Sequence, residues 1–391
     1  MPPAEARRAA DAPGPWWTRV GGLLPTVLSS LAAVGLALLV GGVVILLSGQ
    51  DPVLAYRALF EGAFGGQRAI AETLIAATPL ILGGLAFAVA ARAGMFNIGI
   101  EGQMVVGGLV AGLVGAANWG LPALLYLPLA LGLGALAGGV WGGIPGLLKA
   151  RSGAHEVITT IMLNYLAFQL STFVLNRADL LPVRPDLQAT DKAAPAALLP
   201  RLMPPTRLHA GLLVALLAAL ALWWLMFRTT FGYKLRTVGI SPGAAAYAGI
   251  SWGWAITLAM FLSGVLGGFA GGSEVLGLHG RFYGVPTGYG YTSIAVGLVG
   301  RNNPLGVVFA GLLFGALSAG ATRMQNTAGT SKDLVSVLLG LVILSVAAFA
   351  SVESYRQRRR QTARARSDSR DRAAAGAGDP DVDPVTPKEV V

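Results

Sequence analysis

One stretch of the sequence decides the fold class: residues 94–108 read Gly-Met-Phe-Asn-Ile-Gly-Ile-Glu-Gly-Gln-Met-Val-Val-Gly-Gly. It places Asn97, Glu101 and Gln103 in an otherwise apolar, glycine-rich segment about as long as half a membrane crossing. An ionised carboxylate at bilayer depth costs about 3 kcal/mol on insertion scales, so we expect Glu101 to face protein or water. Glycines let the backbone break, which a membrane permits only where backbone lines a cavity or is buried in protein. The stretch therefore predicts a site within a membrane protein.

The composition agrees with this interpretation. The 391-residue chain is 54% hydrophobic and 12% charged, whereas roughly 25% of the residues of a soluble domain are charged. It contains 54 glycines, which suit close helix packing in lipid. The apolar residues come in long runs, so we predict an all-α fold, a polytopic transmembrane helical bundle. The chain has no cysteine, which excludes disulfides and thiolate metal sites.

The apolar runs predict about ten membrane spans. They cover residues 23–47, 70–91, 94–116, 121–148, 156–176, 210–227, 253–272, 287–300, 305–322 and 333–350. A polar loop over 177–209 and a basic stretch over 228–251 interrupt this membrane domain of 23–350. A basic N-terminal tail, 1–22, precedes it, and a C-terminal tail, 351–391, which we expect to be disordered, follows it.

The short links between the spans predict an orientation with both termini in the cytoplasm, N-in and C-in. Positive charges favour the cytoplasmic side, and this orientation places six basic residues of short links there: Lys149, Arg151, Arg228, Lys234, Arg236 and Arg301. The loop 177–209 is then external. The net charge of +10 owes much to an arginine cluster in the C-terminal tail. We interpret that cluster as the basic flank of the last span and predict no nucleic-acid partner.

Two of the spans, 94–116 and 287–300, are short and interrupted by glycines, and they lie in different halves of the chain. Paired irregular segments of this kind point to the transport pathway in membrane proteins built from inverted repeats. The second begins Thr287-Gly-Tyr-Gly-Tyr-Thr-Ser293, whose aromatic and hydroxyl side chains are suited to a polar route. The alternative is that these glycines only allow close helix contacts.

The basic stretch contains a second feature, a short helix predicted over Ala244–Ala248. Ser241 is suited to be its N-cap, Pro242 its first turn and Gly249 its end. A short helix of small residues on the cytoplasmic face is well suited to dock into a groove of a partner. The alternative is a surface loop with an incidental helix.

Three motifs together resemble a known family. The segment Gly94–Gln103 is similar to the signature of permease subunits of bacterial ABC importers for nucleosides and simple sugars. Met162-Leu-Asn-Tyr165 and Thr237–Ile250 match further family segments in the same order. The resemblance covers about residues 25–350 and is nearest to the larger permease of the nucleoside systems. Both tails lie outside it.

The resemblance implies a mechanism and partners. Two permease subunits would form the pathway, a cytoplasmic ABC ATPase would hydrolyse ATP with Mg²⁺, and an external lipoprotein would deliver a nucleoside or simple sugar. We expect the second permease to be a distinct paralogue and the location to be the bacterial plasma membrane. This chain has no Gly-Lys dipeptide, so it lacks a Walker A loop; we predict that it binds no cofactor and is not itself an enzyme. The residues predicted to dock on the ATPase are Gly239, Ser241, Pro242, Ala244, Ala245, Tyr247 and Gly249.

Two roles are open for Glu101. It either stabilises the broken span by accepting hydrogen bonds from freed backbone N–H groups or a neighbouring helix, or it contacts polar substrate in transit. We favour the structural role, because importers of this kind leave tight recognition to the binding protein. Asn97 and Gln103 share its place as a hinge beside the pathway. Asn164 and Tyr165 are candidates to line the pathway, although Asn164 is equally suited to bridge helices.

The main competing hypothesis is a secondary transporter driven by protons or sodium, which needs intramembrane carboxylates as ion sites. Glu101 is the one acidic residue predicted deep in a span, since Glu72, Glu274 and Asp333 fall at span borders. Such a carrier would also have no need of a docking segment. A membrane-embedded enzyme is the third hypothesis, and the absence of a nucleophile motif or a metal-spacing histidine pair argues against it.

Overall fold

The computed structural model describes residues 35–36, 38–284 and 288–329, and isolated positions between 334 and 345. The tails predicted over 1–22 and 351–391 lie outside the described residues, as do nearly all of the span 333–350 and the first half of 23–47. The chain divides into two compact units, and residues 41–340 form the larger one. The account below concerns that unit.

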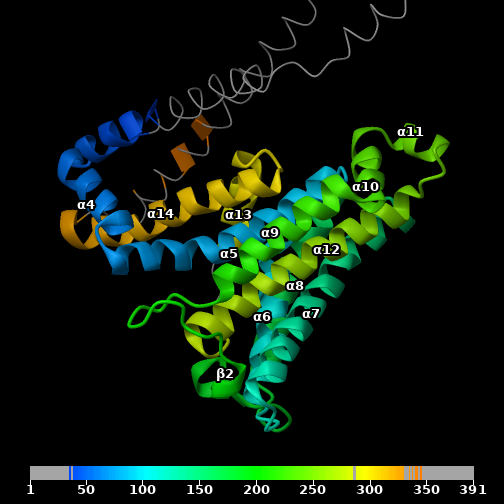
Figure 1. Cartoon of the computed structure of the whole chain (residues 1–391), viewed down its shortest axis with the longest axis horizontal. Coiled ribbons are helices and arrows are strands. Elements are labelled where there is room, and N and C mark those ends of the chain that lie inside the picture. Colours follow the sequence, from blue (N-terminus) through cyan, green and yellow to red (C-terminus); the bar gives the residue numbers. More distant parts are fainter. Residues whose placement is uncertain are drawn as a thin grey trace, which may run out of the picture. The chain divides into compact units, whose positions relative to one another are not determined.

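The unit is built mostly of helices (Figure 1). The α-helices are α4 (Pro52–Phe64), α5 (Gln67–Arg92), α6 (Ile100–Ala116), α7 (Ala123–Ser152), α8 (Glu156–Leu175), α9 (Gly211–Arg228), α10 (Thr230–Ile240), α11 (Pro242–Tyr247), α12 (Trp252–Ser273), α13 (Tyr289–Val299) and α14 (Pro304–Ala328). The short elements are the strands β1 (Val183–Arg184) and β2 (Ala189–Thr190), the 3₁₀ turns η1 (Pro185–Leu187) and η2 (Pro195–Ala197), and the π-helical turn η3 (Glu274–His279). In the described part of the chain β1 and β2 are the only strands, so the prediction of a helical bundle is confirmed.

Six of the described helices are long and apolar enough to cross a membrane. They are α5, α7, α8, α9, α12 with its η3 extension, and α14. The central one is α5, because 89% of its most apolar window is buried inside the protein. By contrast α6 has 17 residues and α13 only 11, so the two segments predicted to be irregular are the short ones.

Glycines bring α6, α7 and α12 into backbone contact. A Cβ atom added to Gly138 would lie 2.5 Å from the carbonyl oxygen of Gly264, and one added to Gly107 would collide with the Cα of Gly268. Small residues allow such close crossings in a membrane, where packing replaces the hydrophobic effect between helices. At these positions the glycines therefore allow close contacts between helices, which is the alternative role considered for glycines in the sequence.

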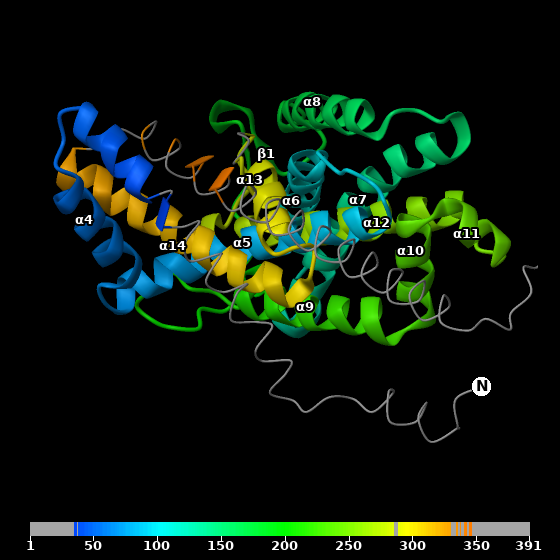
Figure 2. The ribbon, with the colours of Figure 1, turned by 90° about the horizontal axis from the view of Figure 1, so that it is seen from above.

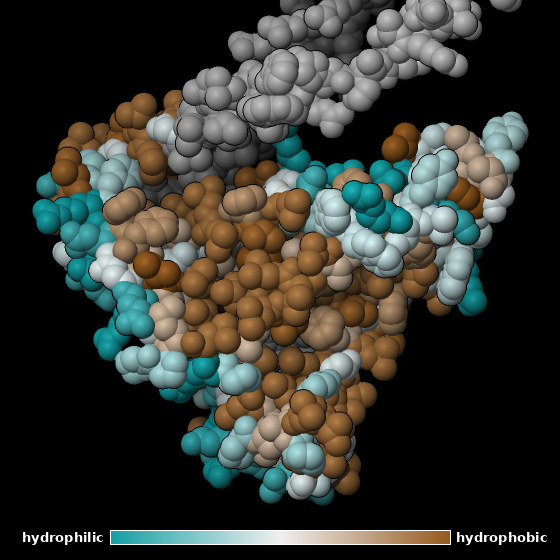
Figure 3. Space-filling model, in the orientation of Figure 1, coloured by the Kyte–Doolittle hydropathy of each residue, from teal (hydrophilic) through white to brown (hydrophobic). Residues whose placement is uncertain are grey.

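The outer faces of two helices are largely apolar. Apart from Arg228 at its end, the exposed residues of α9 are apolar and include Leu213, Leu217 and Trp224, and Figure 3 shows a broad hydrophobic surface over α9 and its neighbours. Helix α8 lies at the margin of the bundle in Figure 2, and only 22% of its most apolar window is buried inside the protein. Its exposed face is also mostly apolar, with Ile158, Leu166 and Phe173, but it includes the polar side chain of Gln169.

Three elements were not predicted from the sequence. Helix α4 is too short and too charged for a search based on membrane spans: Asp51 caps it by accepting from the N–H of Val53 at 2.8 Å, and Arg57 pairs with Glu61 at 2.9 Å. Helix α10 lies in the basic stretch 228–251. The loop 177–209 contains the β1–β2 pair and covers the end of α6 and η3, where the N–H of Leu199 donates to the carbonyl of Leu276 at 2.9 Å.

Candidate functional site: a junction between two half-helices

The carboxylate of Glu101 joins the two short helices. Its Oε1 accepts a hydrogen bond from the N–H of Gly288 at 2.8 Å, and its Oε2 accepts one from the N–H of Gly290 at 2.7 Å. Glu101 is 0% exposed, so this buried charge is compensated by backbone donors. Hydrogen bonds to an ionised acceptor are the stronger kind.

Both helices begin at this point. Glu101 lies in the first turn of α6, and Gly288 is the N-cap of α13 with φ +76°. A Cβ atom added to Gly290 would lie 2.5 Å from the Cα of Glu101, so the two N-termini are in direct contact. The first N–H groups of a helix lack intrahelical partners, and the N-terminal end of its dipole favours a negative charge. These are the hydrogen bonds that were predicted for a structural role of Glu101. Contact between Glu101 and a substrate in transit stays a hypothesis.

A second set of polar side chains holds the chain just before α6. Asn97 donates through Nδ2 to Ser263 on α12 at 2.7 Å and accepts from the N–H of Gly99 at 2.9 Å. Gln103 lies 3.2 Å from Asn97, and Ser263 donates to the carbonyl of Ala86 on α5 at 2.6 Å. All of these side chains are buried. The network ties the break before α6 to α5 and α12.

Asn164 connects α8 to the same junction. Its Oδ1 accepts from the N–H of Gly102 at 2.9 Å, and its Nδ2 donates to the carbonyl of Ile98 at 3.0 Å and lies 3.3 Å from the hydroxyl of Tyr291 on α13. Asn164 therefore bridges α8, α6 and α13. Tyr165 is not part of this cluster: it is 63% exposed and packs edge-on against Phe168.

The structure thus brings together Asn97, Glu101, Gln103 and Asn164. The partners Gly288 and Gly290 lie in the second irregular segment, so the pairing of the two segments was a usable sequence signal. Ser263 was missed, because a lone serine in an apolar span carries no signal of its own. Among the described residues no group of three or more His, Asp or Glu is placed to hold a metal ion.

The predicted docking segment forms a helix. Ser241 caps α11 by accepting from the N–H of Ala244 at 3.3 Å, Pro242 occupies the first turn, and Gly249 follows the helix with φ +71°. The helix spans Pro242–Tyr247, so Pro242 lies in the first turn as predicted and the helix ends one residue before the predicted Ala248. Within this helix the side chain of Ala245 is buried, whereas Tyr247 is 97% exposed.

Helix α10 joins this segment to the bundle. A Cβ atom added to Gly239 would collide with the carbonyl of Arg92 at the end of α5. The guanidinium of Arg92 lies over the ring of Phe227, as does that of Arg236, at 5.5 and 5.1 Å from its centroid. Arg92 also donates to the carbonyl of Asn302 at 2.9 Å, in the turn between α13 and α14. The docking segment is therefore linked to chain segments beside both half-helices.

Comparison with known proteins assigns the chain to a family. Residues 69–347 match the model of the permease component of branched-chain amino acid transport systems. The chain belongs to this permease family. The permease is 41% identical to the guanosine ABC transporter permease protein NupP of Bacillus subtilis, over 83% of its own length and 94% of that protein.

Two further relatives are 35% identical to the permease. The nucleoside ABC transporter permease protein NupB of Lactococcus lactis aligns with 84% of the permease over 92% of its own length. The glucose ABC transporter permease protein TsgB13 of Haloferax volcanii aligns with 88% over 90%. No solved structure matches. Together with its membrane-length helices, these relationships make the permease a multi-pass membrane subunit of an ABC importer, a transport component rather than an enzyme.

Proposed function

We propose that the permease forms part of the pathway by which a bacterial ABC importer takes up a nucleoside across the plasma membrane. The observation that carries this substrate class is the 41% identity to a guanosine permease, over 83% of this chain and 94% of that protein. A simple sugar is the second candidate, supported by the 35% identity to a glucose permease.

The proposal includes about ten spans with both termini in the cytoplasm. The basic residues Lys149 and Arg151 end α7, and Arg228 ends α9, directly before α10. Hydrophilic residues gather at α10 and α11 at one side of the hydrophobic surface in Figure 3. The positive-inside rule makes that side cytoplasmic.

The partners of the proposal are a cytoplasmic ABC ATPase, a second permease that is a distinct paralogue, and an external lipoprotein that delivers the substrate. ATP and Mg²⁺ would bind the ATPase, and α11 would dock on it through Tyr247 and its small-residue face. Helix α10 contacts the end of α5, and its Arg236 lies over the same ring of Phe227 as Arg92. Movement of the ATPase would therefore be transmitted through α10 to the segments that lead to α6 and α14. The family relationship favours this system over the ion-driven carrier, and Glu101 supports the same choice, since both its oxygens are occupied by backbone donors.

The proposal is tested by reconstituting the permease with the ATPase, second permease and lipoprotein encoded beside it. ATP-dependent uptake of labelled nucleosides, exceeding that of glucose, is the expected result. Uptake of glucose alone would replace the substrate class, and gradient-driven uptake by this chain without an ATPase would overturn the proposal.

The docking role is tested by Tyr247→Ala, which is expected to reduce ATPase recovery in a pull-down. Trp119→Ala is the matched control, because Trp119 is also an exposed aromatic residue, 54% exposed, but lies outside the docking segment. Equal recovery with both variants would remove α11 from the docking surface.

A further inference from the structure

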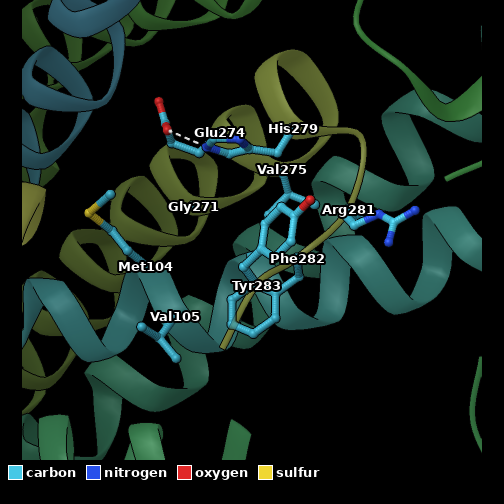
Figure 4. Close-up of a pocket in the computed structure, with 10 residues that line it drawn as sticks. Met104, Val105, Gly271, Glu274, Val275, His279, Arg281, Phe282 and Tyr283 are labelled. Atoms are coloured by element: carbon cyan, nitrogen blue, oxygen red, sulfur yellow. Dashed lines mark ion pairs between the residues drawn. The ribbon is translucent and has the colours of Figure 1, made fainter. Parts of the chain in front are cut away.

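A cavity of about 250 Å³ lies beside α6, away from the polar junction. Met104 and Val105 of α6 form one wall, and Glu274 and His279 of η3 form another (Figure 4). Phe282, in the segment that follows η3, contributes to the third wall, together with its neighbour Tyr283. Met104 is three residues beyond Glu101 on α6, so the cavity begins about one helical turn from the junction.

Glu274 is a buried carboxylate without hydrogen bonds among the described residues. It is 5% exposed, and its Oε1 is buried with no partner. Its Oε2 lies 3.6 Å from His279 Nε2, which is ion-pair rather than hydrogen-bond distance (Figure 4). A buried polar group without a partner is rare and calls for a functional explanation. The π-helical turn that carries it is a local geometry found frequently at functional sites.

The walls of the cavity define what it accepts. Phe282 and Tyr283 supply aromatic rings, and Met104 and Val105 supply apolar contacts. A mostly apolar pocket with a few polar groups that fix orientation is typical of small-molecule sites, and its size, below the ~300–1,000 Å³ of drug-sized pockets, suits a single ring system. A carboxylate oxygen without a hydrogen bond, such as Oε1 of Glu274, accepts from N–H or O–H donors only. These properties favour a planar heteroaromatic ring with N–H groups on its edge.

We propose that this cavity is a transit subsite for the base of a nucleoside, with Glu274 accepting hydrogen bonds from the N–H groups of the base edge. This inference rests on the proposed function and adds the place and the chemistry of substrate contact. Guanine is the best match among common bases, because its ring N1–H and its exocyclic amino group are adjacent donors suited to the two oxygens of one carboxylate. The aromatic residues contact the ring, and base–aromatic contacts are tolerant of sequence and hence of base identity.

The test uses the reconstituted complex with Glu274→Gln, which keeps the shape of the side chain and removes the charged acceptor. Uptake of labelled guanosine is compared with that of 1-methylguanosine, in which N1 carries no hydrogen. We expect the variant to lower guanosine uptake by about 10-fold, the effect of losing a hydrogen bond to a charged group, and to leave the smaller uptake of 1-methylguanosine nearly unchanged. The matched control is Glu61→Gln, since Glu61 is an exposed carboxylate on α4 paired with arginines.

A second measurement excludes two other causes of lower uptake, a folding defect in the variant and a change in delivery by the binding protein. Equilibrium dialysis of labelled guanosine against the detergent-solubilised complex without its lipoprotein is expected to show weak binding that Glu274→Gln abolishes and Glu61→Gln keeps. Equal guanosine uptake and binding by wild type and Glu274→Gln would overturn the subsite, as would an equal loss for both nucleosides. Failure of the wild-type complex to import any nucleoside would instead overturn the proposed function, so the two failures are distinct.

Discussion

Two buried glutamates of the permease have opposite surroundings. Glu101 gives both oxygens to backbone N–H groups of α13, whereas Glu274 has an oxygen without a partner and a second at 3.6 Å from a histidine. A buried charge that the protein satisfies stabilises the structure around it, and one that it leaves unsatisfied is costly unless a ligand completes it. The difference suggests that the first carboxylate holds the pathway together and that the second is available to what passes through.

The largest effect that tests this contrast is expected for Glu101→Ala. Removing the carboxylate leaves the N–H groups of Gly288 and Gly290 without their acceptor, and at about 1.5–3 kcal/mol for each hydrogen bond to a charged group the loss is roughly 3–5 kcal/mol. We expect the free energy of unfolding to fall by that amount and uptake of every substrate to fall with it. Thermal unfolding of the purified permease, followed by the near-UV signal, measures the change. A variant as stable as wild type would show that Glu101 is not the structural member of the pair.

The next largest effect is expected at low pH. It concerns His209, which packs against η3, the turn that carries Glu274. His209 is buried outside the membrane spans, and desolvation lowers its pKa from 6.5 to about 4. A Cβ atom added to Gly277 in η3 would lie 2.6 Å from the Cγ of His209. The unfolded chain binds this proton more readily, so stability is fully present above pH 6.5 and is lost as the pH falls toward about 4. The loss amounts to about 3 kcal/mol from the linkage relation.

Acid is therefore expected to loosen η3 before it loosens the Glu101 junction. Hydrogen-exchange protection factors, which correct for the intrinsic pH dependence of amide exchange, should fall between pH 7 and pH 4 first in residues 273–279 and later in residues 98–103. His209→Asn keeps an acceptor for the N–H of Gly211, which His209 Nδ1 accepts at 3.2 Å, but has no group that titrates in this range. The protection factors of residues 273–279 in this variant should be nearly independent of pH, and a pH dependence equal to that of the wild type would exclude His209 as the cause.

Much of this contrast could be predicted from the sequence, and part could not. The cost of a charge in a membrane identified Glu101, and the glycine-rich stretch around Gly288 and Gly290 was identified as its irregular counterpart. That the two segments bond to each other depends on tertiary packing across nearly two hundred residues, which a local pattern does not contain. Glu274 was placed at a span border, because α12 was expected to end near residue 272. Its extension through the π-helical turn buries a side chain that the hydropathy pattern placed near water.

A smaller effect tests whether the glycine at position 290 is needed for the close contact between α6 and α13 or only for backbone flexibility. Gly290 lies against the backbone of Glu101, whereas a Cβ atom added to Gly243 of α11 meets nothing within 4 Å. Gly290→Ala should therefore destabilise the permease by about 1–3 kcal/mol through overpacking. Gly243→Ala should be neutral or stabilising, since alanine favours a helix over glycine by up to about 1 kcal/mol. Chemical denaturation of the two variants makes the comparison, and equal effects would mean that the half-helices do not meet as described.

The smallest effect, and the one with opposite sign, is expected at Glu274. Replacing it with methionine removes a buried carboxylate that has no hydrogen bonds and substitutes a flexible apolar side chain that fills irregular space. Replacing buried ionic groups with apolar residues of similar volume is often neutral or stabilising, so we expect Glu274→Met to raise the free energy of unfolding by about 1 kcal/mol while nucleoside uptake falls. Residues retained at a cost in stability are those that serve function. A variant that loses stability, as Glu101→Ala does, would place both carboxylates in the same structural role and end the contrast between them.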